Sequence, residues 1–186
     1  MMSPAEMDPR VKRTRQMLYA AFMELLAEKG FEAITVADIT KRSTLHRATF
    51  YGHFTDKFAL LEAKIGDDFQ EMLDSRLANA SNCQEGIRQL ILAVCDFFSR
   101  VAAGCQKHQR QFDPIMETRI KAMVRDFLLA GPLQKQGANA DTQLRATMAS
   151  WAICGAALEW SRHPQGTTEE LAKTMLPRVV FTLHGE

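Results

Sequence analysis

The chain has 186 residues, of which 46% are hydrophobic and 24% charged, as in an ordinary globular protein of one or two domains. No apolar run approaches the roughly 18 residues of a membrane span, and the N-terminal segment lacks the apolar core of a secretory signal. We therefore expect a cytoplasmic protein. The four cysteines are widely spaced and have no nearby histidine pairs, which argues against a zinc site and favours buried, reduced thiols.

The formal net charge is only +1, but the charge is unevenly distributed. Residues 10–57 contain nine Lys or Arg against five Asp or Glu, whereas residues 58–186 contain fourteen against fifteen. A basic first third joined to a neutral remainder suits an anion-binding region on a larger body. A solvated basic helix face explains the same charge equally well.

The first third of the chain predicts short helices. Residues 1–9 contain two prolines and little to bury, so they are expected to form a disordered arm. Apolar residues at spacings of three and four predict a first helix over residues 10–29, before Gly30. Thr35 is then a good N-cap for a second helix that ends near residue 42, with Asp38 three positions on.

A turn at residues 43–46 precedes a third helix, predicted to start near His46 and to end near His53, and Thr55 is expected to cap the fourth. Two short helices joined by such a turn are typical of a helix-turn-helix. The third helix presents hydrogen-bond donors and small residues outward, namely Arg47, Ala48, Thr49, Tyr51 and His53. This composition fits the DNA major groove, where Arg binds guanine and a methyl group meets thymine.

The rest of the chain also reads as helical, so the predicted fold class is all-α. The expected helices span about residues 56–78, 87–101, 113–130, 141–162 and 168–183. A polar break is expected at residues 104–111 and an exposed loop at 134–141, and no strand or internal repeat is predicted. We expect a helix-turn-helix domain at residues 10–65 and a larger helical domain at 66–186.

The run from Thr49 to Phe54, followed by Lys57 and Leu60, resembles the recognition helix and following turn of TetR-family transcriptional regulators. Thr35, Ile39 and the Gly30–Phe31 pair also fall where that family's pattern places them. The similarity covers about residues 10–65, whereas the downstream region resembles the family only in length and helical character. It implies a homodimeric DNA-binding regulator.

The resemblance implies roles for single residues. Arg47, Ala48 and Thr49 match positions that face base edges. Phosphate contacts match a second set, which consists of Thr35, Tyr51, His53 and Lys57. Phosphate contacts fix the register on DNA and base contacts carry sequence information.

Two positions in the turn depart from the family pattern. Thr44 replaces a glycine, although a left-handed turn residue is unfavourable for a β-branched side chain. His46 stands where a better N-cap is usual, and it is a candidate contact to a phosphate or a base. Its charge would then make DNA binding depend on pH.

The last two helices are apolar over much of their circumference, which favours a homodimer in which they form a four-helix bundle. An ordinary intramolecular core is the alternative. Candidate residues for an effector pocket are Phe98, Met116, Met123, Phe127, Met148 and Trp151, because Met and aromatic side chains suit adaptable apolar sites. Candidates for polar contacts to the effector are His108, Glu117, Arg119 and Glu159.

No catalytic arrangement, phosphate-binding glycine loop, cofactor site or metal site is predicted. We therefore expect a dimeric repressor that a small-molecule effector of unknown identity releases from a palindromic double-stranded DNA operator. An all-helical carrier or enzyme without operator affinity is the competing class. An architectural DNA protein without sequence discrimination is a third.

Overall fold

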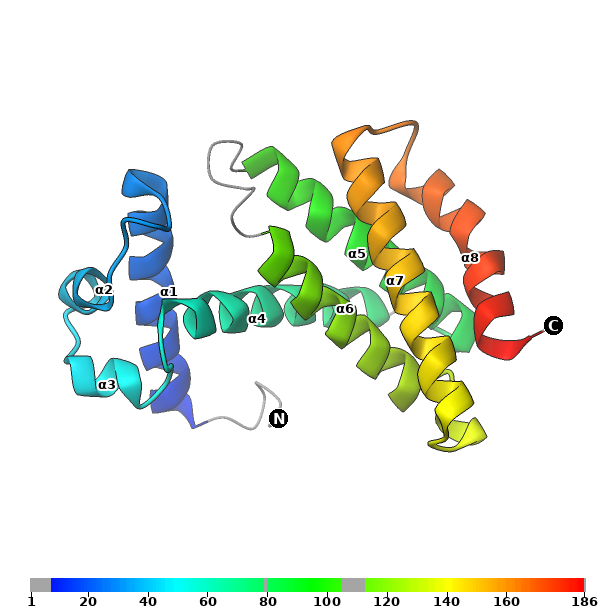
Figure 1. Cartoon of the computed structure of the whole chain (residues 1–186), viewed down its shortest axis with the longest axis horizontal. Coiled ribbons are helices and arrows are strands. Elements are labelled where there is room, and N and C mark those ends of the chain that lie inside the picture. Colours follow the sequence, from blue (N-terminus) through cyan, green and yellow to red (C-terminus); the bar gives the residue numbers. More distant parts are fainter. Residues whose placement is uncertain (1–7, 79, 105–112, 186) are drawn as a thin grey trace. The chain divides into compact units, whose positions relative to one another are not determined.

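The computed structural model describes residues 8–78, 80–104 and 113–185, and within these ranges it is helical with no strand (Figure 1), as predicted. The chain divides into two compact units, Met1–Asp67 and Asp68–Glu186. The predicted polar break, apart from Gly104 at the end of a helix, lies outside the described residues together with His108 and Cys105. In the described part of the chain, no helix has both the length and the apolarity to cross a membrane.

The first unit contains α1 (Pro9–Lys29), α2 (Val36–Ser43), α3 (Arg47–Tyr51) and the start of α4 (Lys57–Leu77). The helix α1 begins within the arm expected to be disordered. The carboxylate of Asp8 accepts the N–H of Arg10 at 2.8 Å, and Pro9 occupies the first helical position, where its fixed φ is favourable. Residues 1–7 of that arm lie outside the described residues.

One face of α1 forms the centre of the first unit. Its buried side chains are Leu18, Tyr19, Ala21, Phe22, Leu25 and Leu26. The helix α2 packs on α1, and Phe31 and Ile34 of the connecting segment are each only 1% exposed. The helices α2 and α3 are therefore held on α1 by apolar burial.

The helix α4 begins at Lys57, and its cap differs from the prediction. The carboxylate of Asp56, rather than Thr55, accepts the N–H of Ala59 at 2.8 Å, so Asp56 satisfies a free N–H of the first turn. Both residue types cap helices well, and the sequence pattern did not separate two adjacent candidates. The boundary between the two units falls within α4, at Asp67.

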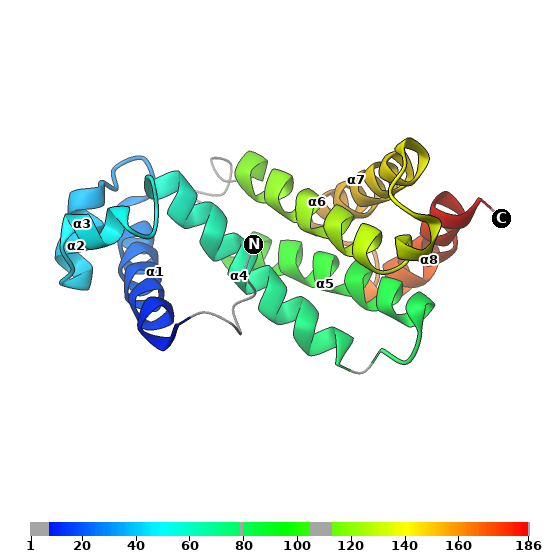
Figure 2. The same cartoon turned by 90° about the horizontal axis from the view of Figure 1, so that it is seen from below.

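The second unit contains the end of α4, followed by α5 (Cys83–Gly104), α6 (Asp113–Ala130), the 3-10 helix η3 (Gln134–Gln136), α7 (Ala140–Arg162) and α8 (Thr168–His184). The helix α7 packs against α5, α6 and α8 (Figure 2). Reciprocal caps start α7 and α8, from Asn139 with Thr142 and from Thr167 with Glu170. The loop predicted at 134–141 contains η3 and the first residues of α7.

The core of the second unit is aliphatic and aromatic. Much of α5 is buried, and the ring of Phe97 packs edge-on against Phe69 of α4 at 5.6 Å between centroids. Cys95 and Cys154 are buried as expected, and burial raises the pKa of both thiols to about 12. Cys83 is exposed, contrary to the expectation of burial, because it is the first residue of α5.

Candidate nucleic-acid interface

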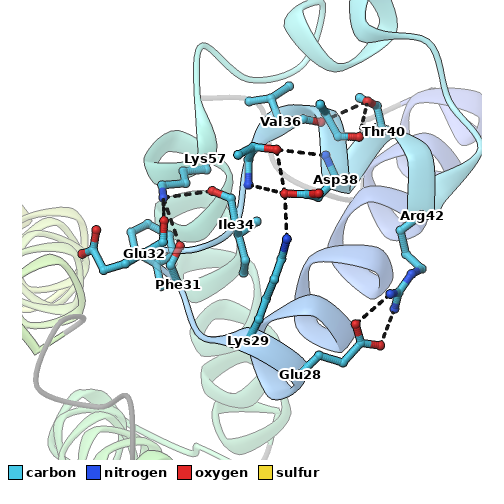
Figure 3. A network of polar contacts seen from close by, with 12 residues as sticks. Glu28, Lys29, Phe31, Glu32, Ile34, Val36, Asp38, Thr40, Arg42 and Lys57 are labelled. Atoms are coloured by element: carbon cyan, nitrogen blue, oxygen red, sulfur yellow. Dashed lines mark hydrogen bonds and ion pairs between the residues drawn. The ribbon is translucent and has the colours of Figure 1, made fainter.

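A reciprocal cap fixes the start of α2. Asp38 donates its N–H to the Thr35 hydroxyl oxygen at 3.2 Å, and its carboxylate accepts the Thr35 N–H at 2.8 Å and the Thr35 hydroxyl at 2.6 Å. Lys29 of α1 adds a contact to the same carboxylate at 2.8 Å (Figure 3). Hydrogen bonds from Lys29 first, and then from Thr35, hold the pKa of Asp38 well below its usual range. The predicted cap is confirmed, and it uses the ionised carboxylate.

The turn between α2 and α3 depends on one strained residue. Thr44 has φ 56° and ψ 30°, and no other described residue except glycine has a positive φ. Its N–H donates to Lys41 O at 3.3 Å, and the next N–H, of Leu45, donates to Thr40 O at 3.0 Å. The turn therefore closes α2 with a left-handed residue, at a position where a β-branched side chain is unfavourable.

Two phenylalanines pack α3 against the rest of the first unit. Phe50 is 0% exposed and Phe54 5% exposed, with 5.9 Å between their ring centroids. Phe54 also lies 5.8 Å from the ring of Tyr19 on α1. The inner face of this five-residue helix is thus fixed by aromatic packing, which orients its outer face.

The outer face of α3 carries the predicted DNA-contacting residues. Arg47 and Ala48 are exposed, and Thr49 is half-buried. Tyr51 is 51% exposed and packs edge-on against Phe50. His46 is the exposed N-cap of α3, and its side chain makes no capping hydrogen bond. These side chains leave hydrogen-bonding groups and a methyl group available on one short helix.

His53 is half-buried beside the same aromatic cluster. Its ring centroid lies 6.2 Å from that of Phe54. Burial first, and then the nearby charge of Arg15, lower the pKa of this imidazole below its ordinary value of 6.5. The lowered pKa favours the uncharged ring, so a phosphate contact from His53 would be a neutral hydrogen bond rather than an ion pair.

Lys57, which matches a phosphate-contact position of the family, is hydrogen-bonded within the protein. Its Nζ donates to three backbone carbonyl oxygens, those of Phe31 at 3.0 Å, Glu32 at 3.1 Å and Ile34 at 3.0 Å (Figure 3). An ammonium has three donors, so these carbonyls use all of them. In this structure Lys57 thus lies against the segment between α1 and α2.

Sequence reasoning missed the ion pairs that join α1 to its neighbours. Arg42 of α2 binds Glu28 at 2.7 Å and Glu24 at 3.0 Å, both on α1. Asp67 of α4 accepts the Tyr19 hydroxyl at 2.8 Å and Arg15 at 3.2 Å. The carboxylates at 24 and 28 lie one turn apart, which was the available signal for the first pair. No sequence spacing indicated the second.

The second unit separates the six predicted effector-pocket residues into two groups. Phe98 and Met116 are buried, and Met123 and Phe127 are half-buried. Met148 and Trp151 are 55% and 63% exposed in the single chain, so neither is enclosed among the core residues of its unit. Both lie on the face of α7 opposite Ala146, Ala149, Ile153 and Ala157, which are buried. The helical spacing of the apolar residues predicted that Met148 and Trp151 share one face of α7, but it did not show whether that face lies in the core or at the surface.

An apolar surface of α7 and α8 remains uncovered in the single chain. Its large side chains are Leu144, Met148, Trp151 and Phe181, each more than half exposed. A Cβ added at Gly155 of α7 would meet no atom within 4 Å. In Figure 1, α7 and α8 lie side by side. Within the described residues no group of three potential metal ligands occurs.

Known proteins match these two units to different extents. The family of bacterial regulatory proteins named tetR matches residues 18–63, which include α2, the turn and α3. The HTH-type transcriptional regulator YxbF of Bacillus subtilis (strain 168) is 44% identical over 70 residues. These residues are 37% of this chain but only 18% of that protein, so the likeness covers a minor part of each.

Solved structures match the fold over nearly the whole chain. A TetR transcriptional regulator from Streptococcus agalactiae 2603V has a TM-score of 0.60 and 20% identity, covering 91% of this chain and 95% of that one. FadR of Thermus thermophilus, a TetR-family repressor solved with lauroyl-CoA, has a TM-score of 0.53 and 18% identity, covering 89% and 94%. The family signature at residues 18–63 confirms, for the helix-turn-helix region, the TetR-family resemblance read from the sequence, and the solved structures show that nearly the whole chain shares the fold of such regulators.

Proposed function

We propose that this protein is a homodimeric repressor that binds a palindromic operator through α3 and leaves it when a small apolar molecule occupies the second unit. The observation that carries the proposal is the construction of α3. Its inner face is fixed by the fully buried Phe50, while Arg47 and Ala48 are exposed at its start. In a helix-turn-helix, the first residues of the second helix are those that reach base edges.

In this proposal, Arg47, Ala48 and Thr49 read base edges in the major groove. Arg47 donates to guanine, and the methyl groups of the other two meet thymine. A second set fixes the register on the phosphates and consists of Thr35, His46, Tyr51 and His53. Thr35 adds the N-terminus of α2, whose free N–H groups favour an anion. Lys57 is not in this set, because its ammonium is engaged by carbonyls.

The exposed apolar surface of α7 and α8 supports the proposed dimer. Large side chains gathered on one face, with room beside Gly155 for close helix approach, suit a second copy related by two-fold symmetry. Two helices from each subunit then form a four-helix bundle. Such a dimer binds two half-sites about 34 Å apart, one turn of DNA.

The proposed effector site lies between α5 and α6. Its candidate residues are Phe98 of α5 and Met116, Met123 and Phe127 of α6, which are apolar and buried or half-buried. Side chains of this kind favour an apolar ligand. The fold's likeness to FadR of Thermus thermophilus, solved in complex with lauroyl-CoA, supports an apolar acyl compound as the kind of effector. An effector that binds better to the DNA-free conformation shifts the population away from the operator.

Selection from a random duplex library by the purified protein tests the proposal. We expect an enriched palindrome and an affinity that falls steeply with salt concentration. Nuclease protection of the selected site, with and without fatty acyl compounds of graded chain length, then tests release. A reporter gene behind the site gives the sign of regulation. If no duplex is enriched, the proposed sequence-specific regulator is excluded, and salt-dependent binding to random duplex then separates an architectural DNA protein from a carrier or an enzyme. Equal effector affinity for free and DNA-bound protein rules out the release mechanism.

A further inference from the structure

Lys57 occupies a position that its own helix disfavours. It is the first residue of α4, where a positive side chain opposes the helix dipole. It is half-buried, and no carboxylate lies within ion-pair distance of it among the described residues. A cation held in this way, without a compensating charge, requires strong neutral partners.

Carbonyl oxygens and aromatic rings supply those partners. The three carbonyl contacts, at 3.0–3.1 Å, have ordinary hydrogen-bond lengths and converge on one nitrogen (Figure 3). The same Nζ lies 4.5 Å from the ring centroid of Phe31 and 5.7 Å from that of Phe58, within cation–π distance. The ammonium is therefore enclosed on several sides by one short segment and by its own helix.

The segment held by Lys57 leads directly into α2. Ile34, whose carbonyl is the third acceptor, precedes Thr35, the cap of α2. The Lys29–Asp38 contact fixes the cap to α1, and the Arg42–Glu28 contact fixes the end of α2 to the same helix. Lys57 adds the connection that neither ion pair makes, between the start of α2 and the start of α4.

We propose that Lys57 is a positioning residue for the helix-turn-helix. Its ammonium fixes the segment from Phe31 to Ile34 on α4 and thereby sets the placement of α2, and through the turn that of α3, instead of binding a DNA phosphate. We call the three hydrogen bonds from Lys57 to the carbonyls of Phe31, Glu32 and Ile34 the clamp. The effect of the clamp on operator binding rests on the function proposed above, whereas the existence of the clamp does not.

The clamp is tested first without DNA. In the wild-type protein, NMR of the lysine ammonium groups should show a Lys57 signal that exchanges with water about tenfold or more slowly than that of exposed Lys41, because all its donors are hydrogen-bonded. An exchange rate equal to that of Lys41 overturns the clamp. This measurement needs no variant, so it stands even where a variant fails to fold.

Two substitutions then separate the clamp from a phosphate contact. Lys57→Met removes the charge and the donors, whereas Lys57→Arg keeps the charge but carries its donors on a planar fork that cannot converge on three carbonyls. In both variants we expect amide hydrogen exchange over residues 31–38 to accelerate about tenfold to hundredfold, as the loss of charged hydrogen bonds implies. Lys173→Met on α8, an exposed lysine, is the matched control and should leave these amides unchanged.

Operator affinity distinguishes positioning from mere stability. It is measured on the selected duplex at a temperature where each variant is fully folded. We expect both Lys57 variants to lose about tenfold or more in operator affinity, to keep their affinity for random duplex, and to keep the wild-type salt slope.

A phosphate contact predicts the opposite pattern. Lys57→Arg would then bind like the wild type, and Lys57→Met would lower the salt slope by about 0.9 per subunit. That outcome, or full operator affinity in folded Lys57→Met, overturns the proposal. If the wild type enriches no duplex, the proposed function fails, while the exchange experiments still decide the clamp.

Discussion

The two units of this chain hold their helices together in different ways. In the first unit, the short helices α2 and α3 pack on α1 through apolar side chains, and single polar contacts such as Lys29–Asp38 and Arg42–Glu28 fix α2 in addition. In the second unit, helices of 17 to 23 residues pack mainly through buried aliphatic and aromatic side chains. A helix of five residues cannot be stable alone, so α3 depends on its surroundings for its geometry.

This difference has a functional meaning. Polar contacts with fixed geometry allow one arrangement, which suits a surface that must match the spacing of bases and phosphates. Apolar packing along long helices specifies volume and pattern but tolerates repacking, which suits the effector binding that we propose for the second unit. We therefore expect substitutions in the two units to differ in kind as well as in size.

The largest effect is expected from Phe50→Ala. Phe50 is completely buried under α3, and truncation of such a side chain costs about 3–5 kcal/mol. The first unit should lose its cooperative unfolding transition, and DNA binding with it, while the helices of the second unit persist. Denaturation followed by amide exchange in both units checks this. Simultaneous loss of amide protection in α5 and α7 would contradict this difference between the units, because the two units would then unfold together.

Next in size is Trp151→Glu on the exposed face of α7. Large aromatic residues at the centre of an interface contribute about 2 kcal/mol or more each, and a buried charge there adds a desolvation cost. The protein should elute as a monomer in size-exclusion chromatography with light scattering, with its helix content unchanged. Met23→Glu introduces the same charge at a 45% exposed apolar position on α1 and should leave the dimer intact. A dimeric Trp151→Glu protein would place the interface elsewhere.

Arg47→Ala tests the outer face of α3 directly. The loss of a bidentate contact to guanine should cost about 1–3 kcal/mol in operator affinity and relax the preference at one base pair per half-site. Stability should not change, because Arg47 is exposed. Competition binding with operator duplexes altered at single positions measures this. Arg125→Ala on α6 is the control, and an unaltered base preference in Arg47→Ala would refute the assignment.

Much of the first unit was predictable from the sequence because its signals are local. The Thr35–Asp38 cap, the apolar positions of α1 and the burial of Phe50 each follow from spacings of three or four residues. The position of Lys57 was not predictable. Its partners are main-chain oxygens more than 20 residues away. Because every residue has a carbonyl, the sequence does not indicate which carbonyls a lysine will contact. A cation at the start of α4 was the only hint.

The second unit was predictable in its helices but not in what they face. The apolar stripe of α7 through Met148 and Trp151 is real, yet it is exposed, whereas that of α6 through Met116 and Ile120 is buried. Both stripes have the same helical period, and the period alone cannot distinguish a buried apolar face from an exposed one. The family signature also ends at residue 63, within the first unit, so it does not resolve this.

A smaller and opposite effect is expected from Thr44→Gly. Thr44 holds a left-handed conformation that glycine adopts without strain. Relief of this strain, reduced by the greater entropy of the unfolded chain, should stabilise the protein by about 0.5–1 kcal/mol in denaturant unfolding. Thr182→Gly within α8 should instead destabilise it by a similar amount. Destabilisation by Thr44→Gly would show that the bond from its hydroxyl to Ser43 O, at 2.7 Å, outweighs the strain.

The smallest expected effect concerns His53 and pH. Its pKa in the folded state is lowered by burial and then by Arg15, whereas the unfolded chain binds a proton near pH 6.5. The unfolded state therefore takes up more protons as pH falls, and the stability that this histidine contributes above pH 6.5 is lost below it.

Unfolding free energies measured between pH 7.5 and about pH 5 should fall less steeply in His53→Gln than in the wild type. Carboxylates such as Asp38, whose pKa is lowered by Lys29 and Thr35, act only at more acidic pH, so this window isolates the histidine. Equal slopes for His53→Gln and the wild type would mean that the aromatic cluster under α3 admits the charged ring. In that case the geometry of α3 would be less rigid than its packing implies.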